Sequence, residues 1–312
     1  MQEVFNKRFL VTGGRGFIGR ALVRRLLELG GDVVSLSRRD IATDFKSAGS
    51  REVVVDLRNR ASLNAVFKGD RFDYVFNAVG YIDHSRYFEG GRDVIDTHYC
   101  GTLNLLEHVY WSGLRKFVQI GSSDEYGSAP APQNEQLRES PISPYSAAKA
   151  GATHLIQTLS RTEGFPGVVV RLFLVYGPGQ NLQRFLPQII KGCLEGRKFP
   201  TSSGEQLRDF CYIEDVVEGL LLAALKPEAV GRVINIASGQ PISIRTVIEK
   251  VVKLVGSGQP IFGAYPYRVG ENMELYADIS LAKSLLNWNP KTNLEEGLKR
   301  TIEYCRNSVS GG

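Results

Sequence analysis

The sequence TGGRGFIG at residues 12–19 decides the fold class of this chain of 312 residues. It stands between an apolar run at 8–12, which is typical of a buried strand, and a helical pattern at 18–29. Glycines at this spacing, between a strand and a helix, form the turn that binds the pyrophosphate of a dinucleotide. We therefore predict a Rossmann-type cofactor site near the start of the chain.

Each glycine of this turn has its own physical task. Gly13 permits the tight turn, Gly16 lets the backbone approach a pyrophosphate, and Gly19 lets the helix pack closely on the strand. The N-terminus of the helix then offers free N–H groups and a positive dipole end to the phosphates. The other residues that we assign to this part of the cofactor site are Arg15, Phe17 and Ile18.

Short apolar runs alternate with helical patterns through the first half of the chain. The predicted strands lie at 8–12, 32–36, 52–55, 74–77, 116–120 and 167–172, and the clearest helices at 18–29 and 93–111. Near-continuous apolar strands with helices between them are typical of a parallel sheet that is covered on both faces. The predicted fold class is therefore α/β, with a doubly wound parallel sheet of the Rossmann type.

After about residue 175 this alternation ends. A Gly-Pro-Gly turn at 177–179 interrupts it, and the later elements are predicted as helices at 184–195, 244–255 and 294–304 and a strand at 233–236. We predict a dinucleotide-binding Rossmann domain at 1–175. A smaller substrate domain is predicted at 176–312, partly interleaved with the first.

The composition of the chain argues against several classes of binding partner. The net charge is +5, but the basic residues are scattered, which argues against a nucleic-acid partner. The four cysteines form no CxxC pairs and have no histidines at ligand spacing, so we expect free thiols and no metal site. No apolar run reaches the about 18 residues of a membrane span. The N-terminus lacks a signal pattern, so we expect a cytoplasmic protein without a membrane partner.

The end of the second predicted strand bears on which dinucleotide binds. A site for NAD usually has an acidic residue there, which holds the ribose 2′-hydroxyl. Here the strand ends in Ser37, Arg38 and Arg39, and guanidinium groups pair well with a phosphate dianion. Arg15 points to the same region. We predict NADP(H) as the cofactor, against the alternative of two solvated surface arginines.

The ends of the third and fourth predicted strands would complete the adenosine side. Asp56, followed by Leu57, is placed to accept a hydrogen bond from the adenine amino group. Asn77, Ala78 and Val79 would line the same side with backbone.

A second motif, YSAAK at 145–149, carries candidate catalytic groups. Tyr145 and Lys149 are four residues apart and would share one face of a helix. A nearby ammonium lowers the pKa of a phenol, as does the positive ring of an oxidised nicotinamide, and this would make Tyr145 a usable acid and base. Ser122 follows the strand at 116–120, where it could bind the reacting oxygen. The spacing alone is common in helices and gains weight only with the glycine turn.

Together these motifs resemble the extended short-chain dehydrogenase/reductases, which include nucleotide-sugar epimerases, dehydratases and reductases. The resemblance spans nearly the whole chain and includes GTLNLL at 101–106, VYGPGQ at 175–180, RDF at 208–210 and YAD at 276–278. It implies that Ser122, Tyr145 and Lys149 are the catalytic residues and that Tyr145 and Lys149 also contact the cofactor. It further implies that Arg208 and Arg268 hold a substrate diphosphate.

The stretch IGSSDEYG at 120–127 bears on the reaction. In the dTDP-glucose dehydratases an acid and a base directly follow the catalytic threonine, and Ser123 and Asp124 stand at those places here. The dehydratase acid is therefore absent, and the stretch is closer to the GDP-4-keto-6-deoxymannose reductases. The segment at 204–210 resembles the CDP-abequose type of reductase.

The resemblance therefore implies NADPH-dependent reduction of a nucleotide-linked 4-keto-6-deoxyhexose. Ser123, Asp124 and Asn181 would contact the substrate, and Asp124 would also belong to the catalytic group. The alternative is a 4,6-dehydratase or 4-epimerase on the same scaffold, and GDP-mannose dehydratases, which use NADP, are a rival within it. A regulator that senses dinucleotides is disfavoured by the intact Ser/Tyr/Lys set.

The chain departs from the family at two positions where an asparagine is usual. Leu174 and His98 stand there instead, and His98 could equally be a core histidine. The resemblance also implies a homodimer, formed through helices near 93–111 and 145–161.

Overall fold

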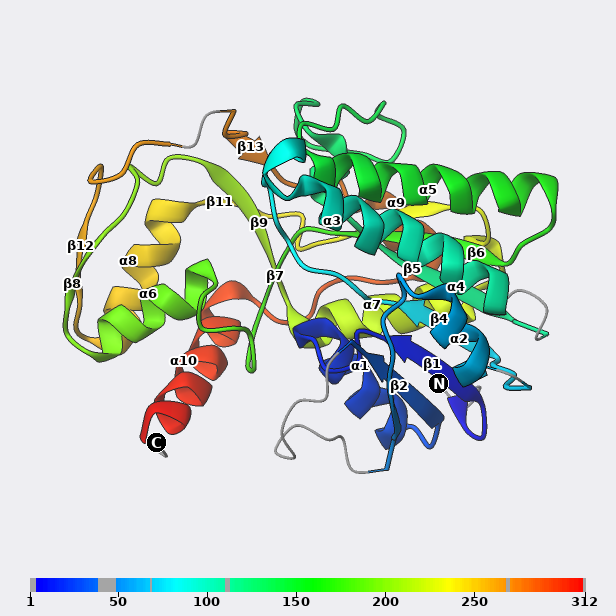
Figure 1. Cartoon of the computed structure of the whole chain (residues 1–312). Helices are drawn as coiled ribbons and strands as arrows, with labels where there is room; N and C mark the ends of the chain where they lie inside the picture. The colour runs from blue at the N-terminus through cyan, green and yellow to red at the C-terminus, as the bar shows by residue number, and fades with distance from the viewer. Residues whose placement is uncertain (1–3, 39–48, 68, 110–112, 268–269, 311–312) are drawn as a thin grey trace.

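The computed structural model describes residues 4–38, 49–67, 69–109, 113–267 and 270–310. Its largest element is a parallel sheet of seven strands in the order β10-β6-β5-β4-β1-β2-β3, on the right of Figure 1. The predicted doubly wound α/β fold is confirmed. The strands of this sheet are β1 (Arg8–Thr12), β2 (Asp32–Ser37), β3 (Arg51–Val54), β4 (Tyr74–Asn77), β5 (Lys116–Ser122), β6 (Gly167–Leu172) and β10 (Val233–Ile236).

The strand order reverses at β1, which pairs in parallel with both β2 and β4. Thr12 is in register with Leu36 on one side and with Asn77 on the other. The successive connections leave in opposite directions from this point, so a crevice opens at the carboxyl ends of these strands. Ligands of open α/β sheets bind in such a crevice.

Helices cover both faces of the sheet because its strands are apolar on both sides. Val11 and Val33 belong to one core cluster, whereas their neighbours Leu10 and Val34 belong to the other. Helices α1 and α7 lie on the first face, and α2, α4 and α5 lie on the second. These helices are α1 (Phe17–Glu28), α2 (Arg60–Phe67), α4 (Gly101–Val109), α5 (Pro144–Thr162) and α7 (Ile213–Leu225).

The helix predicted at 93–111 is interrupted. It begins as α3 (Gly91–Ile95), passes through one π-helical stretch, η4 (Asp96–Cys100), and continues as α4. A π-helical stretch fits an extra residue into the helix and rotates the side chains that follow it. The short 3₁₀ helices are η3 (Tyr87–Glu89), η6 (Ser123–Tyr126) and η7 (Pro227–Ala229).

The second part of the molecule lies on the left of Figure 1. A sheet around β9 and the pair β8–β12 are backed by α6, α8 and α10, which pack on one another. The chain also returns from this part to the first, because β10 pairs with β6 and α9 packs on β10. The boundary near residue 175 stays a prediction. The elements are β7 (Leu174–Tyr176), β8 (Lys198–Pro200), β9 (Leu207–Tyr212), β11 (Pro241–Ser243), β12 (Gln259–Ile261), β13 (Glu274–Leu275), α6 (Phe185–Leu194), α8 (Ile244–Val255), α9 (Ser280–Leu286) and α10 (Leu294–Ser310).

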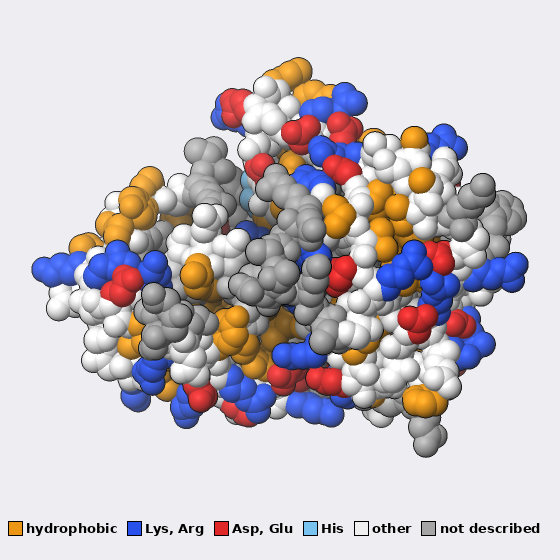
Figure 2. Space-filling view, turned by 60° about the horizontal axis from the view of Figure 1, so that its bottom comes forward, with side chains coloured by type: hydrophobic (Ala, Val, Ile, Leu, Met, Phe, Trp, Pro, Cys, Tyr) orange, Lys and Arg blue, Asp and Glu red, His pale blue; other side chains and the backbone are white. Residues whose placement is uncertain are grey.

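Charged side chains of both signs lie on one face of the molecule. On the face drawn in Figure 2, basic and acidic side chains lie interspersed. Within the described ranges, no helix is both long enough and apolar enough to cross a membrane. The dimer contact expected around α4 and α5 stays a prediction.

A buried ion pair joins the sheet to the helix on its second face. Arg171 in β6 is fully buried, and its Nε lies 2.9 Å from Glu125 Oε2. The same guanidinium also donates to Glu139 and lies 4.4 Å from the centroid of the Tyr126 ring. Glu125 Oε2 accepts a second hydrogen bond, of 2.7 Å, from Thr153 in α5. One carboxylate therefore ties η6, β6 and α5 together.

We expect the substitution Arg171→Met to lower the free energy of unfolding by about 3–5 kcal/mol, because it leaves the Glu125 carboxylate buried without its cation. Urea denaturation measures this loss. The double variant Arg171→Met/Glu125→Gln removes both charges and should recover part of it. A single-variant loss below about 1 kcal/mol would contradict the role of the pair.

Candidate active site

The glycine turn lies against the end of β4 without spare room. A Cβ at Gly13, where φ is +67°, would come within 2.6 Å of the Ala78 carbonyl oxygen, and one at Gly19 within 2.1 Å of the Gly13 carbonyl oxygen. Gly16 is the N-cap of α1 and has no side chain to occupy the space before the helix. Phe17 and Ile18 begin that helix. The turn therefore places the N-terminus of α1 at the crevice, as a bound pyrophosphate requires.

Charged groups gather where a ribose 2′-phosphate would lie. Ser37 ends β2 in a buried position, and Arg38 follows it in an exposed one; Arg39 lies outside the described residues. Arg15 is buried, and its Nε forms a 3.2 Å ion pair with Glu52 in β3. Sequence reasoning missed Glu52, because only the pairing of β3 with β2 brings this carboxylate to the turn.

Asp56 follows β3, and a hydrogen bond holds its carboxylate in place. Arg58 donates to Asp56 at 2.7 Å, and this hydrogen bond is the main cause that lowers the pKa of Asp56. Leu57 is buried, and its carbonyl oxygen accepts a 2.8 Å hydrogen bond from Asn104. Asp56 is therefore ionised and partly exposed, as an acceptor for an amino group must be.

Asn77 holds three elements together beneath the turn. Its Oδ1 accepts from Thr12 at 2.6 Å, and its Nδ2 donates to Thr102 at 3.0 Å and to Gln119 at 2.8 Å. The Asn77 side chain is thus committed to the interior. The backbone that follows it, at Ala78 and Val79, lies against the turn, and the lining of the adenosine side by these residues stays a prediction.

The candidate catalytic side chains converge at the carboxyl end of β5. Ser122 ends that strand and caps η6, and its side chain lowers the pKa of Tyr145, which lies in the first turn of α5. Lys149 lies one helical turn later, with its Nζ 6.0 Å from the centroid of the Tyr145 ring. Its ammonium donates a 2.8 Å hydrogen bond to the Ile120 carbonyl oxygen. The structure therefore brings together the three residues that the sequence predicted.

The protonation of this group is governed by burial. Burial lowers the pKa of Lys149 to about 8, whereas burial and the neighbouring Asp124 carboxylate raise the pKa of Tyr145. The sequence-based expectation of a lowered Tyr145 pKa is wrong for the protein alone, because burial of the phenol and the Asp124 carboxylate raise that pKa. A bound oxidised nicotinamide would add a positive charge that acts in the opposite direction.

His98 lies in the π-helical stretch and packs on the catalytic tyrosine. Its ring is 3% exposed and stands edge-on to Tyr145, with 5.0 Å between the ring centroids. Its Nε2 lies 2.9 Å from the Tyr81 carbonyl oxygen. Burial and the charge of Lys149 lower the pKa of His98 to about 3. His98 is therefore a neutral, buried histidine that fixes the tyrosine ring from one side.

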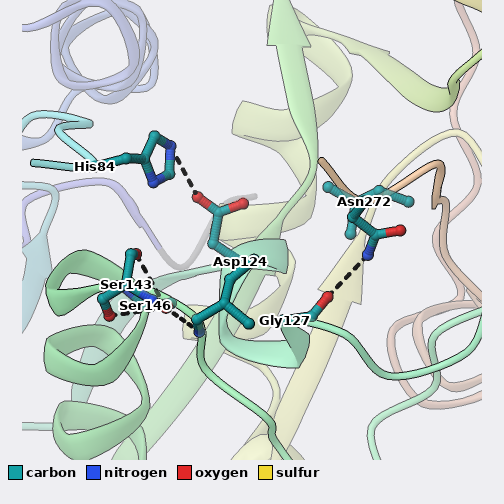
Figure 3. Close-up of a pocket in the computed structure, with 8 residues that line it drawn as sticks. His84, Asp124, Gly127, Ser143, Ser146 and Asn272 are labelled. Carbon is teal, nitrogen blue, oxygen red and sulfur yellow. Dashed lines mark hydrogen bonds and ion pairs between the residues drawn. The ribbon is translucent and has the colours of Figure 1, made fainter. Parts of the chain in front are cut away.

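A small pocket opens beside these groups (Figure 3). Asp124 projects into it from η6, and His84 reaches over it from the loop after β4, with 3.6 Å between Asp124 Oδ2 and His84 Nε2. Burial raises the pKa of Asp124, and the charges of His84 and Arg208 act against that rise. The residues that line the pocket are His84, Asp124, Gly127, Ile142, Ser143, Ser146, Asn272 and Leu275.

The remaining residues assigned to the substrate are spread more widely. Ser123 is buried in η6, and Arg208 in β9 pairs with Glu271. Asn181 is exposed and accepts a 2.8 Å hydrogen bond from the backbone N–H of Gln183 within its own turn. Arg268 lies outside the described residues.

Three residues near the site were missed by sequence reasoning. His84 and Asn272 line the pocket, and the charge of Arg184, the N-cap of α6, acts on Tyr145. None belongs to a short motif. The one available signal was the position of His84 after a parallel strand, where ligand-binding loops lie.

The chain was compared with models of protein families. Residues 9–237 match the family described as NAD dependent epimerase/dehydratase. The chain belongs to this family. The wider resemblance inferred from the sequence is thereby confirmed, including a nicotinamide dinucleotide as the class of cofactor.

Relatives match over almost the whole chain. A UDP-glucuronate 4-epimerase of Thermodesulfobacterium geofontis is 32% identical, over 96% of this chain and 97% of the relative. A probable dTDP-glucose 4,6-dehydratase of Sinorhizobium fredii is 27% identical, over 95% of this chain and 92% of the relative. The structure of a UDP-glucuronic acid 4-epimerase from Bacillus cereus, in complex with UDP-glucuronic acid and NAD, is similar with a TM-score of 0.86 and 28% identity, over 96% and 99% of the two chains. These relatives are epimerases and dehydratases rather than 4-keto reductases.

The depressed pKa of Lys149 predicts a pH-dependent stability. Between about 8, the value in the folded protein, and 10.5, its ordinary value, the unfolded chain binds more protons than the folded one. Stability of the wild type should therefore rise with pH relative to Lys149→Met. We expect the difference in free energy of unfolding to change by about 2–3 kcal/mol between about pH 7 and about pH 10. Urea denaturation across this range measures it.

The exposed Lys191 in α6 provides the matched control, since Lys191→Met should leave the pH dependence as in the wild type. A difference between wild type and Lys149→Met that stays constant across the series would contradict the assignment.

Proposed function

We propose that this chain oxidises C4 of a nucleotide-linked hexose and returns the hydride to the sugar, as a 4-epimerase or 4,6-dehydratase. The observation that carries the proposal is the convergence of Ser122, Tyr145 and Lys149 at the carboxyl end of β5. The glycine turn lies at the same edge of the sheet. The epimerases and dehydratases among its relatives support the same reaction class.

Each side chain would have a defined task. Tyr145 would take the proton from the C4 hydroxyl and later return it, and Ser122 would hold that oxygen by a hydrogen bond. Lys149 would hold the cofactor ribose beside Tyr145, and the positive ring of the oxidised nicotinamide would lower the pKa of the phenol. A bound nicotinamide dinucleotide supplies the hydride acceptor and donor, with its phosphates on the turn that contains Gly13 and Gly16.

Of the two proposed reactions, the position of Asp124 favours the 4,6-dehydratase. Loss of water across C5 and C6 requires a base beside the C4 group, and the Asp124 carboxylate lies in the adjoining pocket. Its charge raises the pKa of Tyr145, which places the two groups in one electrostatic environment. A 4-epimerase needs no such base, because Tyr145 would take and return the proton of the C4 oxygen while the hydride returns to the opposite face of C4.

The 4-keto-6-deoxyhexose reductase favoured by the sequence is the competing proposal. Its support is the strand end at Ser37 and Arg38, which suits NADP(H), because a reductase consumes fresh NADPH at each turnover. NADP(H) preference is proposed on the same residues. Glu52 opposes it, since this carboxylate neutralises Arg15.

Two further assignments belong to this proposal. Arg208 would hold the diphosphate of the substrate, as the resemblance to the family implies, because a guanidinium pairs well with phosphate oxygens. A homodimer through α4 and α5 is also proposed.

The substitution Tyr145→Phe should lower turnover by about 10²–10⁴-fold, the usual contribution of a general acid and base, while the cofactor still binds. Tyr87→Phe, at an exposed tyrosine, is the matched control and should leave turnover unchanged. Steady-state rates with UDP-, dTDP- and GDP-linked hexoses measure the effect. A Tyr145→Phe enzyme with near-normal turnover would exclude the proposed proton transfer.

The same assay separates the competing reactions. Product formed without net change in absorbance of the reduced cofactor supports the epimerase or dehydratase. Oxidation of NADPH in step with product, from a 4-keto-6-deoxy nucleotide sugar, would overturn this proposal in favour of the reductase.

Arg38→Ala should weaken binding of NADPH by about tenfold or more and leave binding of NADH nearly unchanged, because a charge-assisted phosphate contact contributes about 1.5–3 kcal/mol. Arg24→Ala, which removes an exposed arginine of α1, is the control. Calorimetric titration measures both affinities. Equal affinity of the wild type for NADPH and NADH would refute the NADP(H) assignment.

A further inference from the structure

The pocket beside Ser122 and Tyr145 also bears on which sugars are accepted. We infer that Asp124 makes this a site for a hexose without a negative charge and excludes uronates; this inference rests on the proposed function. With the C4 oxygen at the two catalytic hydroxyls, the neighbouring carbons of the ring must lie against the adjoining pocket. Its charge then acts on whatever group those carbons carry.

The negative charge of Asp124 is only weakly balanced. Its side chain is 27% exposed, and the nearest basic side chain is the His84 imidazole, at 3.6 Å and itself 43% exposed. Arg208 acts on Asp124 from farther away, but its guanidinium is already paired with the carboxylate of Glu271. Glu271 adds negative charge of its own to the surroundings of Asp124.

The other described walls of the pocket offer a carboxylate no cation, and two of their polar side chains donate to the backbone. None of the described lining residues is a lysine or an arginine. Ser146 Oγ donates to the Ser143 carbonyl oxygen at 2.9 Å, and Asn272 Nδ2 donates to the Gly127 carbonyl oxygen at 2.8 Å. These donors are therefore directed at the protein's own backbone, as Figure 3 shows for Asn272.

Apolar side chains complete the pocket. Ile142 and Leu275 line it, and a carboxylate placed against them would lose its hydration without a replacement. A hydroxymethyl or methyl group has no such cost, and a sugar hydroxyl can donate to Asp124. The carboxylate of a uronate, one bond from C5, would instead face a like charge, which opposes its binding at close range.

The test compares neutral and acidic sugars on the same nucleotide. Calorimetry on the enzyme loaded with NAD(P)⁺ measures binding of UDP-glucose against UDP-glucuronate, dTDP-glucose against dTDP-glucuronate, and GDP-mannose against GDP-mannuronate. We expect the neutral sugar of the accepted nucleotide to bind at least about tenfold more tightly. Asp124→Asn, which keeps the shape of the side chain, should reduce this ratio at least about tenfold by strengthening the binding of the uronate.

Glu89→Gln is the matched control, because it removes one exposed carboxylate of η3 outside the pocket lining, and its ratio should equal that of the wild type. Wild-type enzyme that binds the uronate as tightly as the neutral sugar would overturn the inference without any variant, as would a ratio that Asp124→Asn leaves unchanged. Failure of all six compounds to bind would instead overturn the proposed function.

Discussion

The geometry of the candidate site depends on one buried carboxylate, that of Glu125. One of its oxygens accepts the backbone N–H of Ser122 at 2.8 Å, and the other accepts from Thr153 and Arg171. The end of β5, the neighbouring strand β6 and helix α5 are therefore fixed relative to one another at a single point. Tyr145 lies on that helix and Ser122 at that strand end, so the position of one relative to the other follows from this arrangement. A buried charge with three partners is sensitive to any loss among them.

Much of the fold could be predicted because its signals are local. The glycine turn and the near-continuous apolar strands specify a parallel sheet without any knowledge of distant contacts. Helix α7 was not predicted, because it is apolar on almost every side. It packs between α1, the sheet and the second part of the molecule, and thus lacks the alternation of apolar and polar faces that reveals a helix in a sequence. The π-helical stretch before α4 was missed for a related reason, since it leaves no mark in composition.

The same difference between local motifs and tertiary packing decides which residues of the candidate site could be predicted. Ser122, Tyr145 and Lys149 belong to short motifs and were found, whereas His84, Glu52 and Arg184 reach the site only through tertiary packing. The error over the pKa of Tyr145 has the same origin. The spacing of Tyr145 and Lys149 shows that the two share a helix face. It does not show that the ammonium donates to a carbonyl oxygen, or that burial and the Asp124 carboxylate raise the pKa of Tyr145.

Strand β10 returns to the first sheet late in the chain, and this affects the order in which the sheet can form during synthesis of the protein. Strand β10 pairs with β6 through residues 233–236, about sixty residues after β6 ends. While the polypeptide is being made, one edge of β6 therefore stays open until the glycine turn and most of the catalytic residues have long been in place. An unpaired strand edge is a template for pairing with other chains. Nascent molecules of this protein thus pass through an interval in which the cofactor half is assembled but not yet closed, and in which chaperones have a defined edge to protect.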